Sequence, residues 1–422
     1  MTAKKIRPRE RDAIITSLRA GVVPRIGLRH IQVGRLDEVN AIINDLERIQ
    51  NSGSTVRFVV GDFGSGKTFF LTLANILAHN KNIVSAKADI TLERTLYSRD
   101  GRARATFSEL IRNLSIKQKP DGGALKYILE TWLSDFLEMQ KEERKEKLKQ
   151  ELSPLKEYVA GYDFIEILNC YVEAYNDSNE TLLDSCLKWL RGEFRNISSA
   201  KTEIPGIKTF INDENYYEYL KLYSGFFEIA GYDGFLVGID ELVNLTQQRS
   251  EVRKRNYETV LKIINDSLQG ANKGLMFMLG GTPDFVFCER KGLYSYGALQ
   301  TRLARNRFKN EKYKDFSGPL IELDNLSPEE YLQLFKNIRE VFAHGKKEKY
   351  LVTDDELEHF LKIIYSQLGA EEHMTARDAI KGFVSILNIL ESNPGAKFEE
   401  VVGDYDFSTE ANSSDESENV DL

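Results

Sequence analysis

The segment from Gly61 to Thr68 has the residue types and the spacing of a phosphate-binding loop. It matches the pattern Gly-x-x-x-x-Gly-Lys-Ser/Thr at every fixed position. Glycines at 61, 64 and 66 allow backbone conformations that a Cβ would block, so that successive N–H groups turn inward toward an anion. Lys67 would add positive charge at the β- and γ-phosphate oxygens, and the Thr68 hydroxyl would coordinate Mg²⁺. The candidate nucleotide-binding residues here are Gly61, Asp62, Phe63, Gly64, Ser65, Gly66, Lys67, Thr68 and Phe69.

The flanks of this segment supply the context that the motif requires. Residues 55–60 form a β-branched and aromatic run, which predicts a buried strand, and residues 67–80 have the composition of a helix. The N-terminus of that helix would direct its positive dipole end at bound phosphates. The alternative is a glycine-rich surface turn beside an unrelated lysine, and the strand and helix on either side argue against it.

A second chemical signal lies at the end of the apolar run 235–239, which is followed by Asp240 and Glu241. A buried strand that ends in two carboxylates is costly unless a cation or a partner meets them. With a phosphate loop elsewhere in the chain, Mg²⁺ is the economical explanation for Asp240. Glu241 would orient and deprotonate an attacking water, which predicts hydrolysis rather than storage of ATP. Such runs taken alone are often plain strand ends.

Three further positions are candidates for contacts to the reacting phosphates. Thr282 follows the apolar run 274–281 and is either a hydroxyl sensor or an ordinary turn residue. Arg302 and Arg305 are three residues apart, so in a helix they would share a face, and either could be an arginine delivered to a neighbouring subunit. We prefer Arg302 slightly, and a solvated or salt-bridged basic helix is the alternative for both.

The helical pattern near the C-terminus contributes one more cation. Arg377 stands at the start of an amphipathic segment, HMTARDAIKGFVSIL, where it could fold over the nucleotide from the same subunit. An ordinary surface arginine is the alternative interpretation.

The elements that must position these residues follow the order of a parallel α/β sheet. Strands are predicted at 55–60, 82–90, 234–240, 274–281 and 319–324, and helices at 34–49 and 67–80. Between the second and third strands the pattern is helical throughout, which predicts an all-helical insertion. Helices near 328–344, 353–369 and 375–390 predict a C-terminal helical lid.

We therefore expect an α/β fold with a P-loop NTPase sheet of the AAA+-like kind. The expected parts are residues 1–103 and 233–325 for the ATPase core, 104–232 for the helical insertion, 326–402 for the lid and 403–422 for a tail. The tail is acidic and poor in apolar residues, which predicts disorder.

Composition limits the class of protein. Of 422 residues 41% are hydrophobic and 29% are charged, as in globular proteins, and no run of about 18 apolar residues predicts a membrane span. The start of the chain has no apolar core of a secretory signal. Three cysteines lie far apart in the sequence without CxxC spacing, which argues against zinc and against a disulfide framework. A reducing, cytoplasmic setting without a membrane partner follows.

Two locally basic stretches are the candidates for contact with DNA, although the net charge of -8 does not favour nucleic acid. The first stretch runs from 94 to 119 and includes Arg94, Arg99, Arg102, Arg104, Arg112, Lys117 and Lys119. The second stretch runs from 290 to 314 and includes Arg290, Lys291, Arg302, Arg305, Arg307, Lys309, Lys312 and Lys314.

The order of these parts resembles AAA+ ATPases, in particular the initiator and helicase-loader branch. The blocks RAGVVPRIGLRHIQVGRLDEV, RFVVGDFGSGKTFFL, LGGTPDFV, RKGLYSYGALQTRL and MTARDAI are similar to the BrxD-type ATP-binding proteins of bacterial BREX phage-exclusion systems. The resemblance covers the ends and the motif blocks, about two thirds of the chain, and is weakest across the insertion.

The resemblance implies roles for named residues. Lys67 and Thr68 take the P-loop roles, Asp240 and Glu241 the metal and base roles, and Thr282 that of the first sensor. Arg302 or Arg305 would be the finger, and Arg377 the second sensor. Residues Val22, Val23, Pro24 and Ile26 stand where such proteins pack against adenine. One departure is that no winged-helix domain fits after Leu390, which puts direct duplex binding in doubt.

The leading hypothesis is a Mg·ATP-hydrolysing AAA+ protein of antiviral defence. It would form a homo-oligomer through its nucleotide sites and act on DNA or load a helicase-like partner. The rival is a nucleotide-gated switch that binds ATP and a protein partner with little turnover. A third interpretation, the insertion as a sensor for a phage protein, has no specific support in the sequence.

Overall fold

The computed structural model describes residues 6–308, 314–367 and 375–403. The chain folds into two compact units. The sheet unit comprises Asp37–Val60 and Ala74–Glu322, and the lid unit comprises Met1–Leu36, Gly61–Leu73 and Leu323–Leu422. The acidic tail predicted at 403–422 lies outside the described residues beyond Gly403, and the five-part division of the chain stays a prediction.

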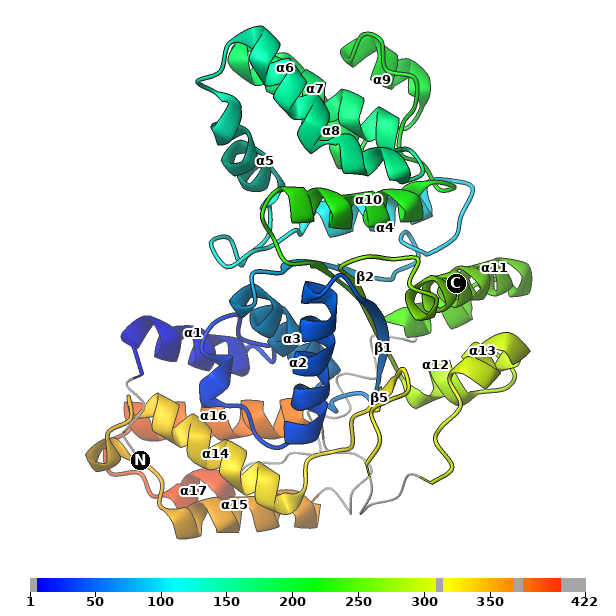
Figure 1. Cartoon of the computed structure of the whole chain (residues 1–422). Helices are drawn as coiled ribbons and strands as arrows, with labels where there is room; N and C mark the ends of the chain where they lie inside the picture. The colour runs from blue at the N-terminus through cyan, green and yellow to red at the C-terminus, as the bar shows by residue number, and fades with distance from the viewer. Residues whose placement is uncertain (1–5, 309–313, 368–374, 404–422) are drawn as a thin grey trace. The chain divides into compact units, whose positions relative to one another are not determined.

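A five-stranded parallel sheet forms the centre of the sheet unit (Figure 1). Its strands are β1 (Ser54–Val60), β2 (Val84–Asp89), β3 (Phe235–Asp240), β4 (Leu275–Gly281) and β5 (Leu320–Glu322), in the order β2-β3-β4-β1-β5. All seven residues of β1 and of β4 are buried, as expected of parallel strands that are covered on both faces. The strands agree with those predicted, and the α/β P-loop fold class is confirmed.

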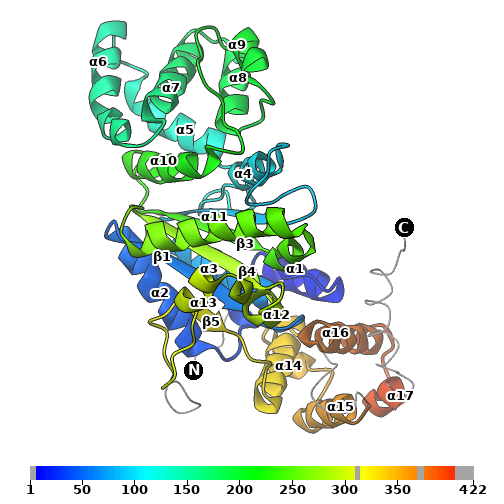
Figure 2. The same ribbon diagram turned by 90° about the vertical axis from the view of Figure 1, so that its right-hand side faces the viewer.

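The insertion between β2 and β3 is helical, as the sequence predicts. Its helices are α4 (Arg102–Arg112), α5 (Leu125–Leu133), α6 (Lys141–Glu151), α7 (Gly161–Asn176), α8 (Glu180–Leu190), α9 (Ile197–Glu203) and α10 (Tyr216–Ile229). Figures 1 and 2 both show α4 and α10 between the sheet and the other insertion helices.

The insertion and the sheet share one hydrophobic core. A single buried cluster extends from strand residues such as Phe277 to Trp189 in α8. Within it the ring of Phe164 in α7 packs edge-on against Tyr223 in α10, with centroids 5.2 Å apart. Because no separate core isolates the insertion, a structural change in it must also disturb packing next to the sheet.

Six other helices lie wholly or partly in the sheet unit. They are α2 (Leu36–Gln50), α3 (Lys67–Asn80), α11 (Ser250–Leu268), α12 (Pro283–Phe287) and α13 (Gly297–Arg302), with the short 3-10 helix η5 (Leu293–Ser295). The helices α9 and α11 are absent from the sequence-based prediction. In α11 the charged positions interrupt the apolar pattern, although Tyr257, Val260 and Ile264 are buried.

The lid unit has its own helical core. Its helices are α1 (Pro8–Arg19), α14 (Pro328–Phe342), α15 (Asp354–Gln367), α16 (Ala376–Ser392) and α17 (Phe398–Gly403). Phe335, Phe360 and Phe383 meet at its centre, with ring centroids 4.9 to 5.5 Å apart. Helix α14 begins with a capping box in which Ser327 and Glu330 satisfy each other's backbone N–H groups. The other 3-10 helices among the described residues are η1 (Leu28–His30), η2 (Ser134–Phe136), η3 (Ser153–Glu157), η4 (Leu242–Gln247) and η6 (Lys347–Lys349).

Candidate nucleotide site

The phosphate loop, Gly61–Thr68, has the backbone geometry of an anion-binding nest. Gly64 and Gly66 both adopt left-handed conformations, with φ of 81° and 88°. Helix α3 begins at Lys67, and its first turn is closed by the Phe70 N–H, which donates to the Gly66 carbonyl at 2.9 Å. Alternating backbone handedness next to a helix N-terminus turns N–H groups toward one point, which is the chemistry needed to hold phosphate oxygens.

Two glycines of the loop are also required by their surroundings. A Cβ added to Gly61 would lie 2.4 Å from the Ser65 hydroxyl oxygen and 3.0 Å from the Leu323 carbonyl. A Cβ added to Gly64 would lie 2.3 Å from the Cβ of Thr375, the residue that caps α16. Both distances are shorter than any van der Waals contact, so larger residues would displace the loop.

Two polar side chains of the loop bear on whether it fits a phosphate. The Lys67 ammonium donates to the carbonyls of Gly61 and Asp62 at 2.8 and 2.9 Å, so it bends back over the loop. It also lies 5.4 Å from the centre of the exposed Phe63 ring. The Ser65 hydroxyl is buried and has no hydrogen-bond partner among the described residues. An unsatisfied buried hydroxyl and a lysine inside a nest fit a polyanionic ligand such as Mg·ATP.

The lid unit brings the predicted adenine segment and the predicted second sensor close to each other. The stems of Arg377 and Lys381, one turn apart on α16, lie 3.5 and 3.2 Å from a Cβ built on Gly21. Gly21 directly precedes the segment 22–26, in which Pro24 is buried and Val23 is half-buried. Through Thr375 the same helix start packs on Gly64 of the phosphate loop.

Phe69 and Thr68, also predicted to bind the ligand, lie in the first turn of α3. Phe69 packs against the hydrophobic core of the lid unit, so its ring anchors the helix start. Thr68 is exposed, and its carbonyl accepts a hydrogen bond from the Thr72 hydroxyl at 2.7 Å.

In the sheet unit, the strand-end residues Asp240, Glu241 and Thr282 lie at the carboxyl edge of the sheet. The register pairs Val60 with Gly281 and Asp89 with Asp240, so β1, β4, β3 and β2 end along one edge. Asp240 is buried, and one of its oxygens accepts the Glu241 N–H at 2.9 Å. Glu241 is exposed and has a left-handed backbone with φ of 58°, which is unusual for a residue with a Cβ. Carboxylate oxygen at this edge suits a hard cation such as Mg²⁺.

Asp89 is a strand-end carboxylate that the sequence analysis did not single out. It lies directly across from Asp240 on the neighbouring strand. Burial, followed by the negative charge of Asp240, raises the pKa of Asp89 above its ordinary value. The signal in the sequence was an acidic residue near the end of an apolar strand, but only strand order makes the two carboxylates neighbours.

Thr282 is the N-cap residue of α12. Its side-chain oxygen accepts the Phe285 N–H at 3.3 Å and caps α12. A hydroxyl has a second lone pair and a proton to donate, so the cap leaves a sensor role open.

The two candidate finger arginines do not share a helix face, so that prediction was wrong. Helix α13 ends at Arg302, and Arg305 lies beyond it in irregular structure. The Arg302 guanidinium donates to the Asn265 side chain at 2.6 Å. Arg305 pairs with Glu322, through its Nε at 2.8 Å, and stacks on the Phe287 ring at 4.0 Å from its centre. The physical reason is that α13 ends at Arg302 with the buried Leu303 as its C-cap, so Arg305 lies outside the helical turn that would align the two side chains.

Three arginines of the first basic stretch form ion pairs with carboxylates of the sheet unit. Arg94 pairs with Glu109 at 3.3 Å and Arg112 with Glu193 at 3.0 Å. Arg102 pairs with Asp100 at 2.8 Å. Each of these arginines is therefore paired within the chain, which lowers the positive charge available to the phosphate backbone of DNA.

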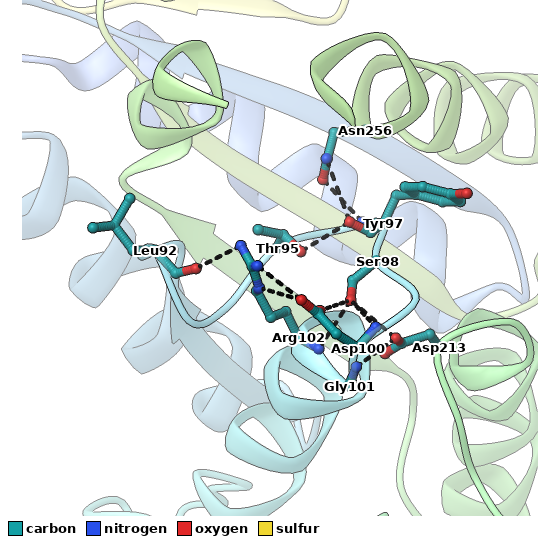
Figure 3. Close-up of polar contacts among 9 residues, drawn as sticks. All are labelled: Leu92, Thr95, Tyr97, Ser98, Asp100, Gly101, Arg102, Asp213 and Asn256. Atoms are coloured by element: carbon teal, nitrogen blue, oxygen red, sulfur yellow. Dashed lines mark hydrogen bonds and ion pairs between the residues drawn. The ribbon is translucent and has the colours of Figure 1, made fainter. Parts of the chain in front are cut away.

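The loop 91–101, which overlaps the start of this stretch, is held by two side chains that are distant in the sequence (Figure 3). The buried Asn256 of α11 accepts the N–H groups of Leu96 and Tyr97 at 2.8 and 2.9 Å. Asp213, which precedes α10, accepts the N–H groups of Gly101 at 2.7 Å and Arg104 at 2.8 Å, so it caps α4. The loop that follows β2 is therefore fixed by both the insertion and α11.

In the second basic stretch, Arg290, Lys291 and Arg307 are exposed, as is Phe308. Lys314 pairs with Asp37 at 3.2 Å and Glu38 at 3.4 Å. Lys309 and Lys312 lie outside the described residues. Arg99, Lys117 and Lys119 of the first stretch are also exposed, so both stretches retain accessible positive charge.

Within residues 6–308, 314–367 and 375–403, no three His, Cys, Asp or Glu side chains cluster as metal ligands. No helix of the same residues is long and apolar enough to cross a membrane.

Comparisons with known proteins identify relatives of the chain. The sequence matches the family model described as BREX system ATP-binding protein BrxC/D over residues 6–406. Among solved structures, a Walker-type ATPase of Pyrococcus abyssi is similar, with 13% sequence identity and a TM-score of 0.42. That alignment covers 92% of this chain and 74% of the other. No curated protein matches the chain.

Proposed function

The chain belongs to the BREX system ATP-binding protein BrxC/D family, and we propose that it hydrolyses the ATP that this family binds. The reaction would be attack of water on the γ-phosphate of ATP, with release of ADP and phosphate. The observation that carries the proposal most is the phosphate loop itself, with left-handed Gly64 and Gly66 directly before the start of α3 at Lys67.

The binding role in this proposal falls on the lid unit. Inward N–H groups of the phosphate loop and the Lys67 ammonium hold the β- and γ-phosphate oxygens. The segment at Val23 and Pro24 packs against adenine, and Arg377 lies over the nucleotide from α16. Thr68 and Asp240 are the residues that would hold Mg²⁺, which when bound offsets charge on the phosphate oxygens.

The catalytic role falls on the sheet unit. Glu241 orients the attacking water and takes its proton, and its exposure leaves the carboxylate accessible to solvent. Thr282 donates its hydroxyl proton to a phosphate oxygen or to the water. Arg302 or Arg305 offsets negative charge in the transition state of a neighbouring subunit. To do so, either arginine must first exchange its partner, Asn265 or Glu322, for the phosphate.

The proposal extends to assembly and to targets. The chain forms a homo-oligomer through its nucleotide sites and acts on DNA, or loads or regulates a helicase-like protein, in defence against phage. Either basic stretch could contact DNA, since each has exposed cations: Arg99, Lys117 and Lys119 in the first, and Arg290, Lys291 and Arg307 in the second. An affinity for DNA that falls with added salt would support this part, and no binding at about 50 mM salt would reject it.

The deciding experiment measures ATP turnover per subunit as the protein concentration is raised. A steep rise means that neighbours complete each site, as the arginine role requires. Constant turnover at an appreciable rate keeps hydrolysis but rejects an arginine in trans. If no turnover occurs at any concentration, or if Glu241→Gln leaves it unchanged, the nucleotide-gated switch replaces the enzyme.

A further inference from the structure

Arg35 lies in an unusual stretch of backbone next to the phosphate loop. Gly34 and Arg35 are both left-handed, with φ of 59° and 58°. A Cβ added to Gly34 would lie 1.9 Å from a carboxylate oxygen of Glu330, so the first turn of α14 packs directly on this glycine. A left-handed conformation is unfavourable for arginine, and it persists only where the surroundings hold it.

The Arg35 side chain connects two segments that are far apart in the sequence. Its Nη2 donates to the carbonyl of Ser65 in the phosphate loop at 2.6 Å and to the carbonyl of Asp324 at 3.0 Å. The same nitrogen is 3.9 Å from the position of a Cβ on Gly66. All of these residues belong to the lid unit. One half-buried guanidinium thus ties the loop to the segment that follows β5.

The contact with the Ser65 carbonyl also fixes the Gly66 N–H, because these two groups are the two ends of one planar peptide unit. In a trans peptide these groups point in opposite directions. A cation that holds the carbonyl on the outside of the loop therefore holds the N–H on the inside. A charge-assisted hydrogen bond at the oxygen also polarises the peptide and makes its N–H a better donor.

We propose that Arg35 is a positioning residue, which orients the Ser65–Gly66 peptide so that the Gly66 N–H faces the phosphates of the nucleotide. Arg35 does not touch the ligand in this scheme. Glycine at 66 would otherwise allow the peptide to rotate, since this residue has the widest backbone freedom. The inference rests on nucleotide binding at the phosphate loop and is independent of hydrolysis.

The test is calorimetric titration of the full chain with ATP, ADP and AMP in the presence of Mg²⁺. Arg35→Ala should weaken ATP and ADP binding equally, by about ten- to a hundredfold, because the loop surrounds the β-phosphate that both share. AMP, which lacks that phosphate, should lose less. Arg35→Lys should recover part of the affinity, since an ammonium can donate to both carbonyls but lacks the fixed planar geometry.

Arg29→Ala is the matched control, because Arg29 lies in the same segment and pairs at 3.1 Å with Glu10. It should leave all three affinities unchanged. Thermal unfolding without nucleotide separates a positioning role from a purely structural one. If Arg35→Ala lowers the unfolding temperature while the affinities stay the same, the inference is overturned. A loss confined to ATP would also overturn it, because it would place Arg35 at the γ-phosphate.

If Arg35→Ala does not fold, Arg35→Lys and Arg35→Gln provide the same comparison. An ADP affinity that is unchanged in both variants would then overturn the inference. Wild-type protein that binds ATP but never hydrolyses it would reject the proposed enzyme and leave the Arg35 result standing. Wild-type protein that binds no nucleotide would reject both.

Discussion

In the phosphate loop the groups that would meet a ligand belong mainly to the backbone, whereas at the strand ends every candidate is a side chain. The loop is held by contacts that leave its N–H groups in place, such as Thr375 on Gly64 and Arg35 on Ser65. In the sheet unit, by contrast, Thr282 caps a helix at the end of β4, and the two arginines, which follow in and after α13, are engaged with Asn265 and Glu322.

If the chain hydrolyses ATP as proposed, this difference predicts that binding and turnover can be separated. A backbone nest is complete once the loop has folded, so binding needs little rearrangement. Side chains that already have partners must exchange them before they act, which ties turnover to a neighbour or to a conformational change. The predictions that follow test whether the two regions divide the work in this way.

The largest effect is expected from Lys67→Ala in the loop. It removes an ammonium that would make two or three charge-assisted contacts to phosphate oxygens, each contributing about 1.5–3 kcal/mol, so kcat/KM should fall by about 10⁴-fold. Steady-state turnover and ATP titration measure it. Lys81→Ala is the control, because Lys81 directly follows the last residue of α3 and pairs with Glu47 at 2.9 Å, away from the loop. Retained ATP affinity in Lys67→Ala would contradict the assignment of binding to the loop.

The next effect is expected from the two arginines, tested one at a time. Replacement of the one that acts in trans should lower kcat by about 10³-fold with ATP affinity preserved, because it offsets charge only in the transition state. Mixing each variant with Glu241→Gln protein is the decisive assay. Activity should return in the mixture if the arginine and the base come from different subunits. No loss with either Arg302→Ala or Arg305→Ala would remove both from the site.

A smaller loss, of about 10²-fold in kcat, is expected for Glu241→Gln, since general-base catalysis contributes about 10²–10⁴-fold. ATP should still bind, because the phosphate loop is unchanged in this variant. Glu251→Gln, on the exposed first turn of α11, is the control. Weakened ATP binding in Glu241→Gln, to the extent seen with Lys67→Ala, would break the comparison between the two regions.

The last effect concerns the stability of the sheet unit and leaves the nucleotide site unchanged. His79 is buried against Ser85, at 2.9 Å from its hydroxyl, and burial lowers its pKa from 6.5 to about 4. Between these values the unfolded chain binds a proton that the folded chain does not, so stability is lost as the pH falls from 6.5 toward 4. The loss approaches about 3 kcal/mol at 1.36 kcal/mol per pKa unit.

Urea unfolding at several pH values, followed for wild type and His79→Gln, measures this effect. The variant should have a flatter dependence between pH 6.5 and 4, because glutamine does not titrate. Equal slopes for the two proteins would show that other groups cause the acid sensitivity.

The sequence predicted the strands, the phosphate loop and the start of α3 because those features are local. A β-branched run, a glycine pattern and a helix start occupy one continuous segment, so their physics can be read without knowing the fold. Asp240 and Glu241 were found for the same reason, as carboxylates at the end of an apolar run. Helix α11 was missed because its buried residues form a narrow face and are separated in the sequence by charged residues.

The sequence alone determined two things: the type of ligand that the loop suits, and the order along the chain of the strands and helices that carry it. The tertiary structure decided the partners of the side chains. It placed Asp89 beside Asp240 and joined Arg35 to Ser65. Each pair is separated in the chain by at least 15 residues, and contacts at that range depend on strand order and helix packing, which no local pattern encodes.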